Sequence, residues 1–177
     1  MRIIMIPVFL LLLVLPLNWG VISLMGVSIP VVKVIAAIVF ALASVTDFLD
    51  GHIARSRHLV TNFGKFADPL ADKMLVMTAF ILLVAQQLVP AWVAAIIVCR
   101  ELAVTGLRLI VAETNGRVIA AAWPGKIKTA TQMFSILFLL LNGLIIGTVL
   151  LYICLFFTVY SGIDYFVKNH AVFTHSI

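Results

Sequence analysis

Acidic residues are concentrated in one stretch of this chain. Four of its seven acidic residues, Asp47, Asp50, Asp68 and Asp72, lie there. If both parts of the stretch are helical, the first pair is three positions apart and the second four apart, so each pair projects from one helix face. Two such faces brought together would gather four carboxylates, which repel one another unless cations bind them or protons neutralise them. Oxygen ligands of this kind suit Mg²⁺, Mn²⁺ or Ca²⁺.

Residues with little or no side chain accompany these carboxylates. Gly51 and Ala54 share the helical stripe of the first aspartate pair, and Gly64 precedes Asp68 by four positions. A ligand can approach the backbone at such positions, where a leucine would block it. Arg55 flanks the same stripe, and its planar guanidinium can donate two hydrogen bonds to one phosphate. The stretch therefore predicts a small-walled pocket with a carboxylate floor and a guanidinium at its rim.

Simpler roles are open to parts of this stretch taken alone. Asp68 and Pro69 could cap the start of a helix, and Asp72 could pair with its neighbour Lys73. Neither role explains why the small residues and the arginine recur at matching intervals. The complete set of spacings therefore favours a functional site.

The rest of the chain is overwhelmingly apolar. Hydrophobic residues make up 64% of its 177 residues and charged residues 11%, with a mean hydropathy of +1.23 and a formal net charge of +5. A soluble domain has about 45–50% apolar and about 25% charged residues. The composition therefore indicates a membrane protein, whose partners are membrane lipids and not nucleic acid. Cys99 and Cys154 both lie in apolar runs, which predicts small buried side chains and no disulfide.

Apolar runs separated by polar breaks predict six membrane-spanning helices. A span needs about 20 residues, with a range of roughly 17–25, so the first run is short. Asn18–Pro30 is an uncharged link, Gln86–Pro90 breaks the chain after the third run, and Asn142–Gly143 separates the last two runs. We therefore expect an all-α fold, a polytopic membrane protein with six transmembrane helices in one bundle. The predicted spans are residues 3–17, 31–47, 68–88, 91–113, 124–141 and 146–167.

Basic residues gather on one side of this predicted bundle. Six spans place both termini on the same side, and only Lys33 lies near the opposite side. An excess of Lys and Arg marks the cytoplasmic side of a membrane protein. We therefore expect both termini and the active-site cavity to face the cytoplasm. Lys73 and Arg100 are predicted to lie within spans but nearer to that side than to the other. The basic residues predicted at its helix ends and loops are Arg2, Arg55, Arg57, Lys65, Arg108, Arg117, Lys126, Lys128 and Lys168.

The acidic stretch matches the pattern D-x2-D-G-x2-A-R-x8-G-x3-D-x3-D at every fixed position. In this it resembles the CDP-alcohol phosphotransferase family, integral membrane enzymes of phospholipid synthesis. The resemblance implies one domain over residues 1–177, located in the bacterial cytoplasmic membrane and commonly a homodimer. Family members usually carry an amphipathic segment before the position of Arg2, and we expect this segment to be absent here.

The resemblance also implies roles for the motif residues. The aspartates matching Asp47, Asp50, Asp68 and Asp72 hold two divalent cations, Mg²⁺ or Mn²⁺, and the last of them, Asp72, is the proposed general base. The CDP part of the lipid donor, CDP-diacylglycerol, is accommodated by the residues matching Asp47, Gly51, Ala54, Arg55 and Gly64.

A second basic set bears on the acceptor alcohol. Residues 100–108 and 125–133 resemble the branch of the family that transfers the phosphatidyl group to glycerol 3-phosphate, giving phosphatidylglycerol phosphate and CMP. Arg100 and Arg108 are about 80° apart around a helix, and with Lys126 and Lys128 they form a candidate site for the acceptor phosphate. Alternatively, the lysines serve membrane orientation or bind anionic headgroups, and Arg100 pairs structurally with Glu101 or with aspartates.

Other functions are also considered. The same chemistry could use phosphatidylglycerol, inositol phosphate or serine as the acceptor. A cation transporter would explain intramembrane carboxylates as an ion site, and a structural scaffold would need no chemistry at all. Neither gives a reason for Gly51, Ala54, Arg55 and Gly64, so we favour the phosphatidyl transfer.

Overall fold

The computed structural model describes residues 2–24, 26–56, 62–115 and 123–168. Within these ranges the side chains of residues 2, 3, 24, 47–56, 62–72, 108–115 and 168 lie outside the description. Over the described residues the chain forms six helices and one β-hairpin. In order these are α1 (Arg2–Val14), β1 (Val21–Leu24), β2 (Val27–Pro30), α2 (Val31–Ser56), α3 (Asn62–Ala85), α4 (Ala91–Asn115), α5 (Trp123–Leu140) and α6 (Leu144–Lys168).

The six predicted helices are all present, and their breaks fall where the polar residues predicted them. Residues 86–90 separate α3 from α4, and Asn142, at φ +55°, lies in the turn before α6. The third helix extends beyond the start of the predicted span. α3 begins at Asn62 and continues through Pro69, so Asp68 does not cap a helix start. Of the basic loop residues, Arg57 and Arg117 lie outside the described residues.

The link between the first two helices contains a short β-hairpin that the sequence did not predict, in a fold that is otherwise helical as predicted. Strands β1 and β2 pair antiparallel, with Val21 opposite Pro30 and Leu24 opposite Val27. Gly26 at φ +83° provides the left-handed conformation that a tight hairpin turn requires. The strands are rich in β-branched residues, which favour extended backbone. This signal is short and lies between two long apolar runs, so the segment was interpreted as a link.

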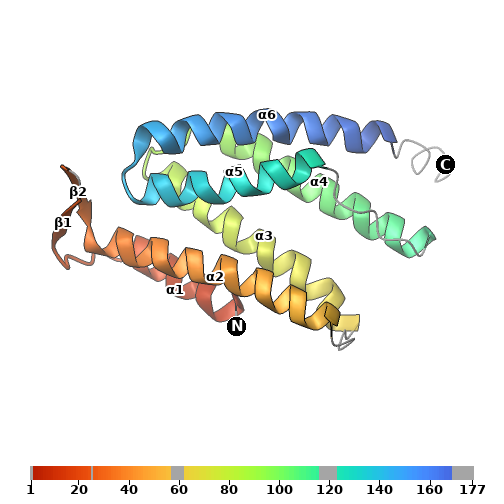
Figure 1. The fold of residues 1–177 in the computed structure, drawn as a ribbon, viewed down its shortest axis with the longest axis horizontal. Coiled ribbons are helices and arrows are strands. Elements are labelled where there is room, and N and C mark those ends of the chain that lie inside the picture. Colours follow the sequence, from red (N-terminus) through yellow and green to blue (C-terminus); the bar gives the residue numbers. More distant parts are fainter. Residues whose placement is uncertain (1, 25, 57–61, 116–122, 169–177) are drawn as a thin grey trace.

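The helices run back and forth between two ends of the molecule (Figure 1). The α2–α3 junction and the C-terminal ends of α4 and α6 lie toward one end, on the right of the view. The hairpin, the α3–α4 junction and the α5–α6 turn lie toward the other. α5 packs along α6, and α1 packs on both α2 and α3. The aspartate-bearing parts of α2 and α3 therefore belong to the same end as the last turns of α4.

The core is built almost wholly from apolar side chains of all six helices. Phe9 of α1 and Phe40 of α2 are fully buried, with ring centroids 5.8 Å apart. α5 and α6 approach closely at Gly147, whose carbonyl accepts a hydrogen bond of 2.9 Å from the Ser135 hydroxyl. A Cβ atom added to Gly147 would lie 2.8 Å from Cγ of Leu139. Glycine at this position therefore permits the α5–α6 contact.

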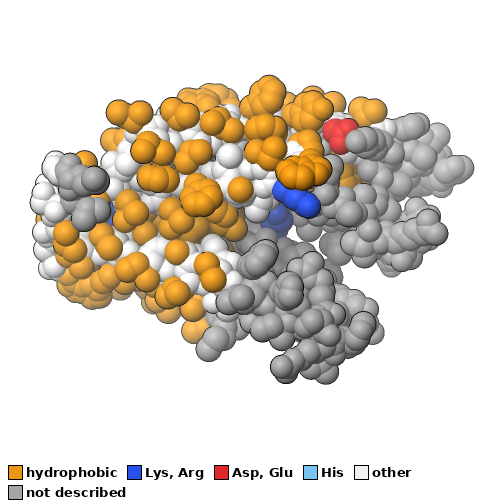
Figure 2. All heavy atoms as spheres, in the orientation of Figure 1, with side chains coloured by type: hydrophobic (Ala, Val, Ile, Leu, Met, Phe, Trp, Pro, Cys, Tyr) orange, Lys and Arg blue, Asp and Glu red, His pale blue; other side chains and the backbone are white. Residues whose placement is uncertain are grey.

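Large apolar side chains are also spread over the surface. On the face shown in Figure 2, hydrophobic side chains cover much of the described surface, with few charged groups between them. Among all described residues, Ile145, Trp123 and Phe156 have 82%, 76% and 66% of their surface exposed, whichever face they lie on. Cys154 is buried as predicted, whereas Cys99 is exposed and corrects that prediction. Its apolar run continues around the whole helix, so the sequence does not show which side faces inward.

One helix among the described residues is long and apolar enough to cross a membrane by itself, residues Leu144–Val167 of α6. Ile4–Val14, Val31–Thr46 and Lys73–Ala85 are apolar but shorter. The charged motif residues explain much of this difference, since they interrupt the apolar runs of α2 and α3. That the other five helices also cross the membrane stays a prediction.

The close approach at Gly147 predicts an asymmetry between two glycine substitutions. Gly147→Ala should lower the free energy of unfolding by about 1–3 kcal/mol, because its methyl group overlaps Leu139. Gly106→Ala in α4 is the control, since a Cβ there meets nothing within 4 Å and alanine favours the helix by about 1 kcal/mol. Thermal unfolding in detergent measures both. Equal stability of the two variants would contradict the proposed packing.

Candidate active site

The motif residues lie on two helices whose neighbouring ends are joined by five residues. α2 carries Asp47, Asp50, Gly51, Ala54 and Arg55, and α3 carries Gly64, Asp68 and Asp72. Both stretches are helical, which confirms the assumption behind the predicted faces. The side chains of all eight residues lie outside the described part of the structure, so their contacts and their roles stay predictions.

The chemistry of this donor set fits divalent cations. Four carboxylates within two consecutive helices supply only oxygen atoms, which suit Mg²⁺ or Mn²⁺. Five intervening residues can span at most about 20 Å, and Figure 1 shows the two helix ends close together. The backbone therefore allows Asp47 and Asp50 to face Asp68 and Asp72 across the junction.

A buried carboxylate lies at the centre of the described charges. Glu101 of α4 has a side chain only 4% exposed, and it forms ion pairs with Lys73 of α3 and Lys128 of α5. Its Oε2 atom pairs with Lys73 and its Oε1 atom with Lys128, and Nη1 of Arg100 lies 3.4 Å from Oε1. We call Lys73, Arg100, Glu101 and Lys128 the Glu101 cluster. It joins three helices through one side chain.

Burial makes this pairing obligatory. The Lys128 side chain is 2% exposed and that of Lys73 27%. A charge removed from water costs several kcal/mol unless an opposite charge and hydrogen bonds compensate for it. Lys128 and Glu101 satisfy this requirement for each other, and Lys73 adds a second cation on the more open side.

Arg100 extends the cluster to a fourth helix. Its Nη2 atom donates a hydrogen bond of 2.8 Å to the Ser161 hydroxyl of α6. A Cβ atom on Gly162 would lie 3.3 Å from Cγ of Arg100, so the missing side chain leaves room for the arginine stem. These contacts are those expected if Arg100 pairs structurally with Glu101, the alternative considered from the sequence.

The other predicted acceptor residues lie in different surroundings. Lys126 is exposed in the first turn of α5, with its Nζ atom 5.6 Å from the centre of the Trp123 ring. Arg108 lies in α4, but its side chain is outside the described part. The structure therefore brings Arg100 and Lys128 together at Glu101 and leaves Lys126 at the surface.

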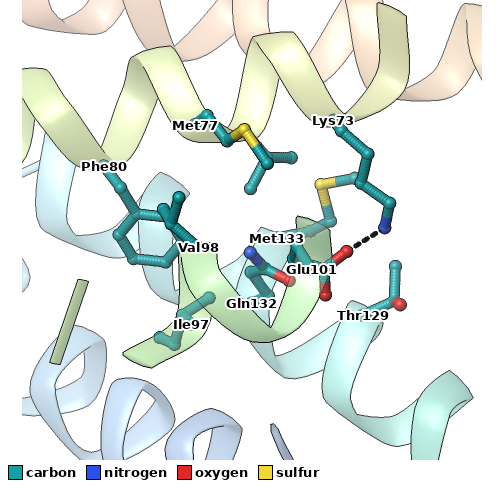
Figure 3. Close-up of a pocket in the computed structure, with 10 residues that line it drawn as sticks. Lys73, Met77, Phe80, Ile97, Val98, Glu101, Thr129, Gln132 and Met133 are labelled. Carbon is teal, nitrogen blue, oxygen red and sulfur yellow. Dashed lines mark ion pairs between the residues drawn. The ribbon is translucent and has the colours of Figure 1, made fainter. Parts of the chain in front are cut away.

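A small pocket adjoins the Glu101 cluster between α3, α4 and α5 (Figure 3). Its polar lining consists of Lys73, Glu101, Thr129 and Gln132. Neither a role for Gln132 nor the pairing of Lys73 with Glu101 was predicted from the sequence. The available signal was Glu101 itself, because a carboxylate inside an apolar helix requires a partner.

Comparisons with known proteins agree with the motif. A sequence model of the CDP-alcohol phosphatidyltransferase family matches residues 1–160. The chain belongs to this family of transferases, as the acidic motif predicted.

Its relatives share most of their length with it. A protein of Bacillus subtilis (strain 168) is 49% identical over 175 residues, covering 95% of this chain and 90% of its own. A protein of Rickettsia bellii (strain RML369-C) is 37% identical, covering 79% and 81%, and one of Sodalis glossinidius (strain morsitans) is 35% identical, covering 98% and 93%. All three are named CDP-diacylglycerol–glycerol-3-phosphate 3-phosphatidyltransferase.

The buried pairing predicts how substitutions in the Glu101 cluster change stability. Glu101→Gln should lower the free energy of unfolding by about 3–5 kcal/mol, because it removes the buried carboxylate that pairs with both Lys73 and Lys128. Adding Lys128→Met to this variant should recover part of the loss, since both buried charges are then removed. Denaturant or thermal unfolding in detergent measures the three proteins.

Lys126→Met is the matched control, the same change at an exposed position of the same helix, and it should alter stability little. A Glu101→Gln variant as stable as the unaltered protein would contradict the pairing. A double variant that is no more stable than Glu101→Gln alone would also contradict the pairing.

Proposed function

We propose that this protein transfers the phosphatidyl group from CDP-diacylglycerol to glycerol 3-phosphate, giving phosphatidylglycerol phosphate and CMP. The observation that carries this proposal is the complete acidic motif on α2 and α3. The chain is also 49% identical to a relative named CDP-diacylglycerol–glycerol-3-phosphate 3-phosphatidyltransferase. The relatives' names support glycerol 3-phosphate over phosphatidylglycerol, inositol phosphate or serine as the acceptor.

The residues of α2 and α3 act on the lipid donor in this proposal. Two Mg²⁺ or Mn²⁺ ions bound by Asp47, Asp50, Asp68 and Asp72 would neutralise the diphosphate and stabilise the departing CMP. Asp47, Gly51, Ala54, Arg55 and Gly64 would hold the CDP part, with the small residues admitting it close to the backbone and the arginine binding a phosphate oxygen.

Asp72 would act as the general base toward the acceptor. It takes the proton from the primary hydroxyl of glycerol 3-phosphate while that oxygen attacks the lipid-side phosphorus. A new oxygen–phosphorus bond forms, and the bond from this phosphorus to the bridging oxygen of the diphosphate breaks. The electron pair and the bridging oxygen leave with CMP, and the proton stays on Asp72 until solvent removes it.

Basic residues of α4 and α5 would bind the acceptor phosphate. Lys128 lies in the Glu101 cluster with Lys73, which directly follows Asp72 in α3. This proximity to the helix of the proposed base supports a phosphate-binding role for Lys128. Arg108 and Lys126 complete the proposed site from the last turns of α4 and the first turn of α5. The contacts of Arg100 with Glu101 and Ser161 support a positioning role for this residue.

We propose that all six helices lie in the bacterial cytoplasmic membrane, as one domain that spans residues 1–177 and forms a homodimer. The apolar surface supports a lipid environment, because soluble monomers rarely expose contiguous apolar patches larger than a few hundred Å². The excess of basic residues at the α2–α3 end supports a cytoplasmic position for the cavity and both termini. A lipid donor could then enter from the bilayer and a soluble acceptor from the cytoplasm.

An acceptor panel tests this function. Purified protein with CDP-diacylglycerol and Mg²⁺ or Mn²⁺ should release CMP when glycerol 3-phosphate is added, and much less with serine, phosphatidylglycerol or inositol phosphate. EDTA should stop the reaction, and added Mg²⁺ should restore it. Turnover with another acceptor but not with glycerol 3-phosphate would overturn the assignment, and cation flux without CMP release would favour a transporter.

Two aspartate substitutions, one in the motif and one outside it as the control, test the role of the motif in this assay. Asp72→Asn should reduce CMP release by at least about 100-fold, because the base is lost, while the protein still folds. Asp164→Asn, on α6 and outside the motif, should retain activity. A fully active Asp72→Asn variant would instead support a structural scaffold.

A further inference from the structure

The pocket beside the Glu101 cluster has room for one small polar group. Its volume is about 10 Å³, close to the roughly 10–15 Å³ that one water molecule needs. Apolar side chains of α3, α4 and α5 form most of its wall, including Met77, Phe80 and Val98. This space suits one hydroxyl group or one water molecule.

The Gln132 side chain supplies an unused donor to this pocket. Gln132 is 3% exposed, and its Nε2 atom has no hydrogen-bond partner among the residues that the structure describes. Figure 3 shows its amide among the lining residues, between the side chains of Val98 and Glu101. A buried donor without an acceptor is costly. The amide nitrogen makes no hydrogen bond to the oxygen atoms of Glu101 and Thr129 in the pocket lining, so an oxygen atom of a bound molecule could accept one from it.

The position of Gln132 relates it to the acceptor proposed above. It follows Lys128 by four residues in α5, so the two side chains project from one helix face, with Cβ atoms about 5–6 Å apart. Lys73, which follows Asp72 in α3, lines the same pocket from the opposite wall. The amide therefore lies one helical turn from the proposed phosphate ligand and faces the helix of the proposed base.

We propose that the Gln132 amide donates a hydrogen bond to the secondary hydroxyl of glycerol 3-phosphate and thereby selects this acceptor. The inference rests on the proposed function. In glycerol 3-phosphate this hydroxyl lies between the phosphate, assigned to Lys128 and its neighbours, and the primary hydroxyl that Asp72 deprotonates. Gln132 is thus a specificity-determining residue, distinct from the groups that bind phosphate or move the proton.

A pair of acceptors tests the proposal. 3-Hydroxypropyl phosphate keeps the phosphate and the primary hydroxyl of glycerol 3-phosphate and lacks only the secondary hydroxyl. The unaltered protein should prefer glycerol 3-phosphate by about tenfold in kcat/KM, the factor expected for one buried neutral hydrogen bond. Gln132→Met keeps the length of the side chain and removes the donor. It should lower kcat/KM for glycerol 3-phosphate about tenfold and leave that for the analogue within about twofold.

Gln86→Met is the matched control, because Gln86 lies beyond the C-terminal end of α3, away from the pocket. It should keep the preference for glycerol 3-phosphate. If Gln132→Met does not fold, Gln132→Leu takes its place, and the acceptor preference of the unaltered protein is an independent readout.

Three results would overturn the inference alone. The first is an equal kcat/KM of the unaltered protein for both acceptors. The second is a Gln132 variant that loses activity toward both acceptors to the same degree, which indicates a structural role. The third is a Gln132 variant that turns over glycerol 3-phosphate with an unchanged preference. If the unaltered protein releases CMP with neither acceptor, the proposed function itself fails, and the inference fails with it.

Discussion

The ion pairs of Glu101 constrain how α3, α4 and α5 can pack. A carboxylate with 4% of its side chain exposed must be compensated inside the protein, and its partners Lys73 and Lys128 come from the two neighbouring helices. Apolar contacts alone tolerate small shifts between helices, but two cations on one carboxylate define both helix register and rotation. Arg100 adds α6 through its hydrogen bond to Ser161. Four of the six described helices thus meet at this one charged centre.

This constraint connects the two halves of the proposed chemistry. Lys73 is the residue after Asp72, so the same pairing that orders the middle of α3 also sets the position of the proposed base. The pairing of Glu101 with both Lys73 and Lys128 brings the proposed acceptor-binding side of α5 to that helix. Toward the opposite end of the molecule the packing is tied by Asn142, which donates to the Ser28 carbonyl and accepts from Lys33. Polar contacts thus tie the helices together near both ends of the fold.

The positions of the helices were predicted from the sequence more fully than the side-chain contacts between the helices. Long apolar runs and the breaks at Gln86–Pro90 and Asn142–Gly143 located the helices, because these signals are local. The hairpin was missed, since its strands are only four residues long and uncharged. The partners of Glu101 lie 28 and 27 positions away in the chain, and spacing within one helix carries no information about them. Gln132 was likewise hidden, because its importance depends on a pocket formed by three helices.

In the proposed site the ends of α2 and α3 gather carboxylates around divalent cations beside the Glu101 cluster. Anomalous X-ray diffraction from crystals grown with Mn²⁺, CDP and glycerol 3-phosphate would locate these cations. We expect two manganese peaks between Asp47 and Asp50 of α2 and Asp68 and Asp72 of α3, with the acceptor phosphate at Lys128. Manganese bound elsewhere, or these aspartates pointing to separate surfaces with no metal between them, would contradict the proposed site.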